Sequence, residues 1–379
     1  MQRVPTAVDT VVVGASAAGL ATAAMLRRAD RSVEALEATD TVGHPWRHHY
    51  DRLHLHTPKS SSALPGLPMP SWWPRYPSRD QVVEYLERYQ EVHGLRPRFG
   101  QPVQRVERVD DHWVVTTADQ QWQSKNVVLA SGNARRPILP DWPGLSTFTG
   151  EVLHSSEFDN GSRWYDRTVL VVGFGNSACE QAIDLAEHGA RPHLSVRSAV
   201  NVIPRDLLGV VPVLQAGIVT RHLPPAVADA LARPLIRLSI GDIRPLGLRP
   251  LPYGPLVQIA RDRHIPLLDI GTIDLIRQGR IAVHGGINRF TENTVVFEDG
   301  TALVVDAVVL ATGYRPALEE FLVGWESVCD SDGRPLISGR PTALPGLYFC
   351  GFTLSPAGML REIGIEAKRI ATCINGGAG

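Results

Sequence analysis

Two glycine-rich stretches have the residue types and spacing of turns that hold the pyrophosphate of a dinucleotide. The first, GASAAG at residues 14–19, follows a β-branched run and opens a helical pattern, and Glu37 ends the next predicted strand about 20 residues on. In such a turn, backbone N–H groups and the positive end of the helix meet the phosphates, while Glu37 accepts hydrogen bonds from ribose hydroxyls. Ser16 stands where the pattern has a second glycine, and its hydroxyl can bond to phosphate. The predicted contacts are Gly14, Ser16, Ala17, Gly19 and Glu37; the plainer alternative is an ordinary strand–turn–helix with small residues.

The second stretch, GFGNSA at residues 173–178, keeps both early glycines and has Ala178 in place of the third, as is common at NADP sites. The strand after its helix ends at Arg197 and Ser198, where the first stretch is followed by Glu37. A guanidinium can pair with a 2′-phosphate that a carboxylate would repel. The alternative is that Arg197 is a solvated surface side chain. We predict that the first stretch binds FAD and the second NADPH, the latter through Gly173, Gly175, Asn176, Ser177, Arg197 and Ser198.

The elements around these turns predict an α/β protein with two Rossmann-like dinucleotide-binding domains. Strand, turn, helix and strand occur twice, about 160 residues apart, and VVLASG at 127–132 is echoed by VVLATGY at 308–314. Helices are expected over 79–93 and 357–374. We expect a discontinuous FAD-binding domain at 1–160 and 285–379 and an NADP-binding domain at 161–284. Residues 52–78, rich in Pro, Ser and aromatics, predict a long functional loop.

Composition excludes several classes of protein. The 379 residues carry 38 basic and 39 acidic side chains, whereas nucleic acid or an anionic membrane as the main partner demands a basic excess. The four cysteines are far apart and form no CxxC pair, so neither a zinc ribbon nor a dithiol redox centre is predicted. No apolar run approaches the 18 or so residues of a membrane-spanning helix. We expect a soluble, cytoplasmic protein with reduced thiols and no metal.

The stretch FTGEVLHSSEF at residues 148–158 fits no periodic element, yet its spacing is informative. Phe148, Gly150, His154 and Phe158 match the F-x-G-x-x-x-H-x-x-x-[Y/F/W] type of signature found in class B flavin-containing monooxygenases. The chain resembles that family, and within it the YUCCA-type enzymes; Phe158 favours the flavin monooxygenase branch, because Baeyer–Villiger enzymes usually have Trp there. Other segments that resemble the family are GHPW at 43–46, RLHLHTPK at 52–59, GNSACE at 175–180, LLDIGTIDLIRQG at 267–279, ATGYRP at 311–316 and LYFCGF at 347–352.

This resemblance implies an NADPH- and O₂-dependent monooxygenase. NADPH would reduce FAD, and the C4a-hydroperoxyflavin formed with O₂ would insert one oxygen atom into a nitrogen, a sulfur or a carbonyl carbon of a small organic substrate. The YUCCA likeness points to an aryl-pyruvate. The alternatives are an NADPH-dependent flavin reductase that passes electrons to an unidentified acceptor, and a non-catalytic redox sensor. A homodimer is the prior for the oligomeric state.

The resemblance also supplies candidate site residues. Lys59 and His154 are the candidates for catalysis: Lys59 would hydrogen-bond the flavin or the peroxide, unless it is a solvated loop residue. For His154 we favour a role in holding the linker and positioning NADP over proton transfer. Trp46 and His56 are expected near the flavin, although Trp46 can equally pack its loop.

The motif Ala311, Thr312 and Gly313 is expected near a nucleotide. A keto acid would be helped by a cationic group, for which Arg205, Arg244 and Arg249 are candidates because they lie in or beside residues 210–252, where the family likeness is weak.

Overall fold

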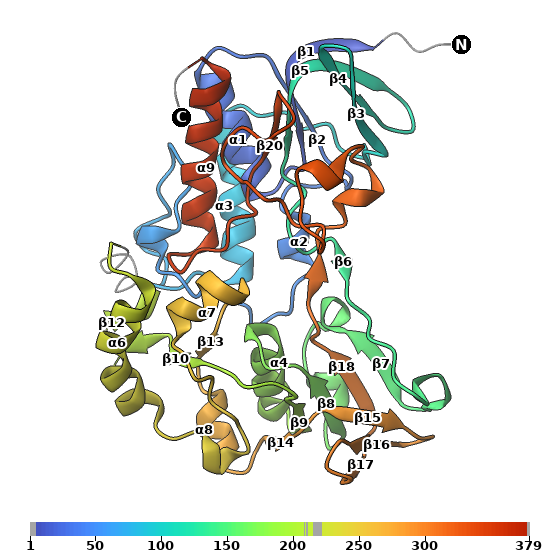
Figure 1. Ribbon diagram of the computed structural model, residues 1–379, viewed down its shortest axis with the longest axis vertical. Helices are drawn as coiled ribbons and strands as arrows, with labels where there is room; N and C mark the ends of the chain where they lie inside the picture. The colour runs from blue at the N-terminus through green and yellow to red at the C-terminus, as the bar shows by residue number, and fades with distance from the viewer. Residues whose placement is uncertain (1–4, 208, 210, 215–221, 377–379) are drawn as a thin grey trace. The chain divides into compact units, whose positions relative to one another are not determined.

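The computed structural model describes residues 5–207, 209, 211–214 and 222–376, and it divides into two compact units (Figure 1). Unit 1 comprises Met1–Arg47, Thr57–Arg136 and Tyr314–Gly379, and unit 2 comprises His48–His56 and Pro137–Gly313. Neither unit is therefore continuous in sequence. Among the described helices, none is both long enough and apolar enough to cross a bilayer.

Unit 1 is built on a six-stranded sheet in the order β2-β1-β5-β4-β3, with β20 also pairing with β5. The strands β1, β2, β5 and β20 run parallel, and β4 is antiparallel to both of its neighbours, β5 and β3. The last four residues of β1 are all buried and three of them are valines, as is typical of a strand inside a parallel sheet. The bounds are β1 (Thr6–Val13), β2 (Val33–Leu36), β3 (Arg105–Val109), β4 (His112–Thr116), β5 (Gln121–Leu129) and β20 (Leu347–Phe349).

The described part of unit 1 contains the α-helices α1 (Ala17–Arg28), α2 (His44–Arg47), α3 (Arg79–Val92) and α9 (Met359–Ile374). Helix α9 lies along α1 (Figure 1), whose alanines allow close packing. Helix α3 begins at a capping box in which Ser78 and Gln81 exchange side-chain and backbone hydrogen bonds. The helices expected over 79–93 and 357–374 are thus confirmed. Short 3₁₀ turns lie at η1 (Lys59–Ser61), η6 (Leu318–Glu320) and η7 (Trp325–Ser327).

Unit 2 is built on a five-stranded parallel sheet in the order β14-β9-β8-β18-β7. Helix α4 (Asn176–Glu187) follows β8, and its buried face is mostly alanine, cysteine and leucine. The strands are β7 (Glu151–His154), β8 (Thr168–Val172), β9 (Arg191–Ser195), β14 (Ala282–His284) and β18 (Ala307–Leu310).

The rest of unit 2 is peripheral. The parallel pair β10–β13, the antiparallel pair β11–β12 and the meander β15–β16–β17 lie outside the five-stranded sheet. Their bounds are β10 (Val202–Pro204), β11 (Asp206–Leu207), β12 (Val211–Pro212), β13 (Leu267–Asp269), β15 (Ile287–Phe290), β16 (Thr294–Phe297) and β17 (Ala302–Val304). The helices are α6 (Pro225–Ile240), α7 (Pro255–Asp262) and α8 (Thr272–Arg277); the 3₁₀ turns are η2 (Leu145–Thr147), η3 (Ser155–Glu157), η4 (Ser162–Trp164) and η5 (Arg244–Leu246). The short strands β6 (Arg136–Pro137) and β19 (Tyr314–Arg315) pair with each other.

The two strand–turn–helix–strand units are where the sequence predicts them, but the unit boundaries differ from those expected. Residues 137–160 and 285–313 belong to unit 2, because β7 and β18 pair with each other and β18 pairs with β8. Residues 48–56 also group with unit 2. The expectation that 148–158 contains no regular element is wrong, since β7 forms the edge of the sheet. Being an edge strand of four residues, β7 buries only its last two side chains and has no readable period.

Candidate functional site

The turn of unit 1 is closed by backbone contacts that only glycine permits. Gly14 has φ +107°, and a Cβ there would lie 2.6 Å from the Ala130 carbonyl oxygen. A Cβ on Gly19 would overlap the carbonyl oxygen of Gly14 itself. Glycine at both positions therefore brings the start of α1 against the end of β1, as a dinucleotide turn requires.

The N-terminus of α1 remains available to an anion. Ser16 occupies the N-cap position, yet its side chain makes no capping hydrogen bond, and the first turn of the helix contains no acidic residue. The N–H groups of the first turn therefore have no capping partner from these side chains, and they carry the positive end of the helix dipole. The geometry fits the pyrophosphate of FAD.

Glu37 is held in place at the end of β2. Its Oε2 accepts a hydrogen bond from the Ala15 N–H at 2.7 Å, and its Oε1 accepts from the N–H and hydroxyl of Thr39 at 3.0 and 2.9 Å. An ionised carboxylate has about four lone-pair positions. The carboxylate is thus oriented by the turn and keeps capacity for a ribose hydroxyl.

The turn of unit 2 has one glycine that the fold requires and one that it does not. Gly173 has φ +129°, and a Cβ there would lie 2.6 Å from the Ala311 carbonyl oxygen. At Gly175 a Cβ would meet nothing within 4 Å. The chain itself thus leaves room for a side chain at Gly175, and a glycine there also leaves room for the close approach of a pyrophosphate.

The side chains after this turn are engaged within unit 2. The Asn176 Oδ1 accepts a hydrogen bond from the Leu268 N–H at 2.9 Å, which ties α4 to β13. Ser177 is hydrogen-bonded to Tyr50. What both residues offer to a nucleotide is therefore chiefly the backbone N–H groups at the start of α4.

Arg197 and Ser198 follow β9 and are exposed. The Arg197 guanidinium makes no hydrogen bond or ion pair with the residues that the structure describes, while its backbone carbonyl accepts a hydrogen bond from Arg249. A free guanidinium at this position fits the 2′-phosphate of NADPH.

Helix α4, which follows the turn of unit 2, contains a buried carboxylate that the sequence analysis did not predict. Glu180 of α4 is 2 % exposed, and the His56 Nε2 lies 2.9 Å from its Oε1. Burial and the Glu180 carboxylate raise the pKa of Tyr50 well above its ordinary value. The sequence analysis expects His56 near the flavin, and in the structure its ring pairs with Glu180 of α4. A glutamate among the alanines and other apolar residues of this helix was the signal that pointed to such a partner, since a buried carboxylate needs one.

His154 connects the stretch 148–158 to the ATG motif. It is 2 % exposed; its Nδ1 accepts the Ser156 N–H at 3.2 Å, and its Nε2 lies 3.2 Å from the Gly313 carbonyl oxygen, to which it can only donate. Burial lowers the pKa of His154, which favours the neutral ring. These contacts suit a positioning role.

The ATG motif itself lies at the end of β18 in unit 2. Ala311 donates its N–H to the Val172 carbonyl, and the Thr312 hydroxyl donates to the Ile138 carbonyl at 2.6 Å. The motif therefore borders Gly173, the first glycine of the second turn.

Lys59 and Trp46 lie in unit 1. The Lys59 ammonium donates to the backbone carbonyls of Ser71 and Trp73, so it joins the two ends of its own loop. Trp46 is half-buried on α2.

The cationic candidates for a keto acid are all engaged. Arg205 pairs with Asp206, Arg244 with Asp242, and Arg249 with the Arg197 carbonyl. Within the stretch 210–252, residues 210 and 215–221 lie outside the described part of the chain.

Comparison with known proteins defines the class and then the family. The model of the pyridine nucleotide-disulphide oxidoreductase family matches residues 11–210, more than half of the chain. Over 352 residues the chain is 37 % identical to the indole-3-pyruvate monooxygenase YUCCA1 of Oryza sativa subsp. japonica, covering 90 % of this chain and 86 % of that protein. The chain therefore belongs to the YUCCA-type family of flavin-containing monooxygenases, which confirms the resemblance drawn from its motifs. It is an oxidoreductase that uses FAD, NADPH and O₂.

Solved structures confirm the fold. A flavin-containing monooxygenase from Stenotrophomonas maltophilia has a TM-score of 0.75 at 23 % identity, covering 98 % of this chain and 99 % of that one. The bacillithiol disulfide reductase Bdr from Staphylococcus aureus is also similar, with a TM-score of 0.69 at 17 % identity over 98 % of this chain and 99 % of that one. The fold is shared by monooxygenases and reductases, so the sequence relationship, not the fold, decides between them.

Proposed function

We propose that this enzyme converts an aryl-pyruvate, O₂ and NADPH, with one proton, into the aryl-acetate, CO₂, water and NADP⁺. One oxygen atom of O₂ enters the new carboxyl group and the other leaves as water, while the bond between the keto carbon and the original carboxylate breaks. The observation that carries the proposal is the 37 % identity, over 90 % of the chain, to a relative named as an indole-3-pyruvate monooxygenase.

Bound FAD would supply both the acceptance of hydride from NADPH and the reaction with O₂. The chain's own residues would bind and orient FAD and NADPH. In unit 1, Gly14 and the N-terminus of α1 would bind the FAD pyrophosphate and Glu37 its ribose. In unit 2, the N–H groups that follow Gly175 would bind the pyrophosphate of NADPH, and Arg197 its 2′-phosphate.

Further roles follow from the hydrogen bonds within each unit. His154, through its bond to the Gly313 carbonyl, would fix the ATG motif against the second turn. Lys59 would shape the loop over 59–73 and keep one N–H for the flavin or its oxygenated form. Trp46 would lie near the flavin, and His56, held by Glu180, would support the start of α4.

The test is oxygen labelling with catalase present. The enzyme is given indole-3-pyruvate, NADPH and ¹⁸O₂; catalase removes free peroxide, which decarboxylates 2-oxo acids without an enzyme. We expect one ¹⁸O atom in each molecule of indole-3-acetate and one NADPH consumed per product. NADPH oxidation without labelled acid, together with peroxide release in a parallel reaction that lacks catalase, would overturn the proposal in favour of a flavin reductase.

We also propose a cytoplasmic location and a homodimer. The first is supported by four cysteines that are all free thiols in the structure, and the second by the prevalence of twofold dimers among oligomers. Size-exclusion chromatography with light scattering measures the assembly directly; a monomeric mass would contradict the dimer.

A further inference from the structure

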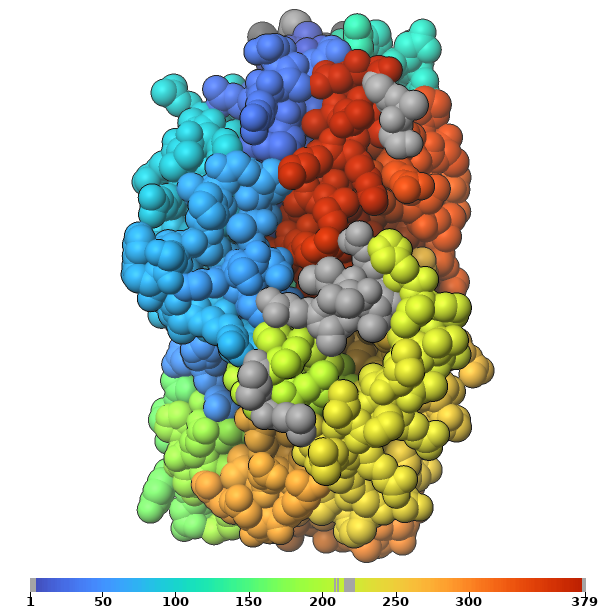
Figure 2. Space-filling view, turned by 90° about the vertical axis from the view of Figure 1, so that its left-hand side faces the viewer, coloured from blue at the N-terminus to red at the C-terminus, as the bar shows by residue number. Residues whose placement is uncertain are grey.

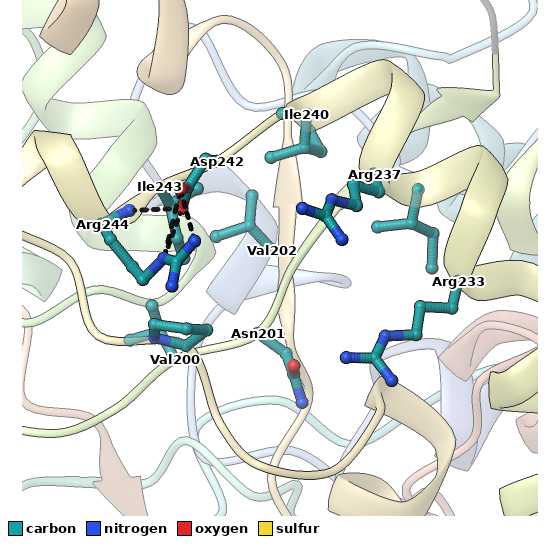
Figure 3. Close-up of a pocket in the computed structure, with 12 residues that line it drawn as sticks. Val200, Asn201, Val202, Arg233, Arg237, Ile240, Asp242, Ile243 and Arg244 are labelled. Atoms are coloured by element: carbon teal, nitrogen blue, oxygen red, sulfur yellow. Dashed lines mark hydrogen bonds and ion pairs between the residues drawn. The ribbon is translucent and has the colours of Figure 1, made fainter.

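Unit 2 contains a pocket outside the residues assigned to nucleotide binding. It has a volume of about 480 Å³ and is formed by the C-terminal half of α6, the strand β10 with the residues before it, and the turn leading into η5 (Figure 3). Small-molecule sites commonly measure roughly 300–1,000 Å³. Neither the turn at 173–178 nor Arg197 and Ser198 contribute to its lining. The pocket is thus large enough for a small ligand of its own.

Two cationic side chains on α6 line this pocket without a hydrogen-bonded or ion-paired partner among the described residues. Arg233 and Arg237 lie one helical turn apart and extend from α6 toward the pocket (Figure 3). Among the described residues, neither makes a hydrogen bond or ion pair, and α6 belongs to the exposed yellow surface in Figure 2. Like charges at this spacing repel each other. An anion between the two guanidiniums would relieve that repulsion and gain charge-assisted hydrogen bonds.

The acidic residue of the pocket does not offset these two charges. Asp242 is bound by Arg244 through two bonds, Nε to Oδ1 at 2.9 Å and Nη2 to Oδ2 at 2.7 Å. These hydrogen bonds, with a smaller contribution from the charge of Arg237, lower the pKa of Asp242 to about 2, and the charge of Asp242 is offset chiefly by Arg244. The pocket therefore retains the two positive charges of Arg233 and Arg237.

The floor of the pocket is apolar. Val202, Ile240 and Ile243 are each 6–7 % exposed and line it from β10, α6 and the turn before η5. An inorganic anion would leave this surface without a partner, whereas a ligand with an apolar body and an anionic head would cover both parts.

We propose that this pocket, the Arg233/Arg237 pocket, is a binding site for an aryl carboxylate. The ring system packs on Val202, Ile240 and Ile243, and the carboxylate lies between Arg233 and Arg237. The choice of an aryl carboxylate rests on the proposed function, since both the aryl-pyruvate and the aryl-acetate have this chemistry. The site deepens that function by giving the enzyme a place that holds substrate or product apart from its nucleotides.

The experiment measures binding to the FAD-containing enzyme saturated with NADP⁺, without turnover. Indole-3-acetate is titrated by calorimetry, and indole, which lacks the carboxylate, is the ligand control. We expect one binding event for indole-3-acetate to weaken at least tenfold in Arg233→Gln/Arg237→Gln, and indole to bind no more weakly in that variant. The matched control is Arg88→Gln, an exposed arginine of α3 in unit 1, which leaves binding unchanged.

Several outcomes would overturn the site. Unchanged affinity in the double variant would do so. Binding of indole-3-acetate that is seen only when NADP⁺ is left out would also overturn the site, since the pocket would then be part of the nucleotide site. If indole-3-acetate binding depends on the two arginines but ¹⁸O labelling fails, the proposed function fails and the site stands. If labelling succeeds and the arginines do not matter, only the site fails. Competition by indole-3-pyruvate under anaerobic conditions ranks substrate against product, and either order supports the site.

Discussion

The two dinucleotide turns place a helix against a strand in the same way but with different residues. In unit 1, Gly19 is required because any side chain would overlap the Gly14 carbonyl; in unit 2 the equivalent position is Ala178. Conversely, Ser16 of unit 1 stands where unit 2 has Gly175, which faces open space. The comparison teaches that glycines in one motif are required for separate reasons, some by the fold and some by the ligand.

The largest effect is expected from Gly19→Ala. The added Cβ would overlap a backbone oxygen, which cannot rotate away, so unit 1 should lose about 1–3 kcal/mol or more of stability. We expect the purified variant to carry little FAD, measured as flavin absorbance per polypeptide. Ala178→Gly, the reverse exchange in unit 2, serves as the control and should keep its FAD. A fully yellow Gly19→Ala protein would show that the first turn is misinterpreted.

Arg197→Ala tests the charge difference between the two strand ends. Loss of a charge-assisted bond to the 2′-phosphate costs about 1.5–3 kcal/mol, so kcat/KM for NADPH should fall roughly 10- to 100-fold. The value for NADH, which lacks that phosphate, should not change. Arg191→Ala is the matched control, since Arg191 begins the same strand and pairs with Asp166. An equal fall in kcat/KM with NADPH and with NADH would contradict the assignment of Arg197 to the 2′-phosphate.

Substitution of the two glycines of unit 2 separates fold from ligand. Gly173→Ala should lower the unfolding temperature, because Gly173 has a positive φ and its Cβ would crowd Ala311. Gly175→Ala should leave the unfolding temperature unchanged and raise the KM for NADPH about tenfold, or about 1.4 kcal/mol. A Gly175→Ala enzyme with unaltered KM would mean that the pyrophosphate does not approach this position.

The smallest expected effect is a pH dependence of stability, which compares strand β9 of unit 2 with strand β2 of unit 1. On β9, the His193 Nδ1 lies 2.8 Å from the His284 Nε2, and burial, then His284 and Arg191, lower the pKa of His193 to about 4. The unfolded chain takes up this proton near pH 6.5. The free energy of unfolding is therefore retained above about pH 6.5 and should fall by about 1–2 kcal/mol as the pH drops toward 4.

Chemical denaturation at pH 7.5 and 5 measures this loss. His193→Gln should flatten the dependence on pH, whereas Glu34→Gln should not. Glu34 is the control on β2 of unit 1, where it pairs with Arg98 at the partly exposed surface, an interaction worth about 1 kcal/mol or less. If the pH dependence of the free energy of unfolding is unchanged in His193→Gln, groups other than His193 cause it.

The sequence predicts well whatever is encoded locally. The strand, the glycines, the helix and the residue at the end of the next strand fall within about 30 residues, so their periodicity and spacing identify both turns. Helix α3 was predicted for the same reason, because its apolar residues recur at helical spacing within one short stretch.

Pairing between distant segments could not be predicted in this way. The pairing of β7 with β18 moved the unit boundary, and nothing local to Glu151–His154 indicates that partner. His56 and Glu180 meet across a similar separation, and the chemistry of either residue alone allows many partners. Arg233 and Arg237 were overlooked because an arginine on a helix is usually a solvated residue.

The interleaving of the two units also fixes the order in which they can form during translation. Unit 2 has all its residues once Gly313 has been added, whereas the sheet and helices of unit 1 still need β20 and α9, which ends at Ile374. At about 5–20 residues per second, the ribosome needs roughly 3–12 seconds for the residues between those two points. The first turn to be synthesised thus belongs to the unit that is completed last. The proposed FAD site is therefore finished only after unit 2, the proposed NADPH-binding unit, has had time to fold.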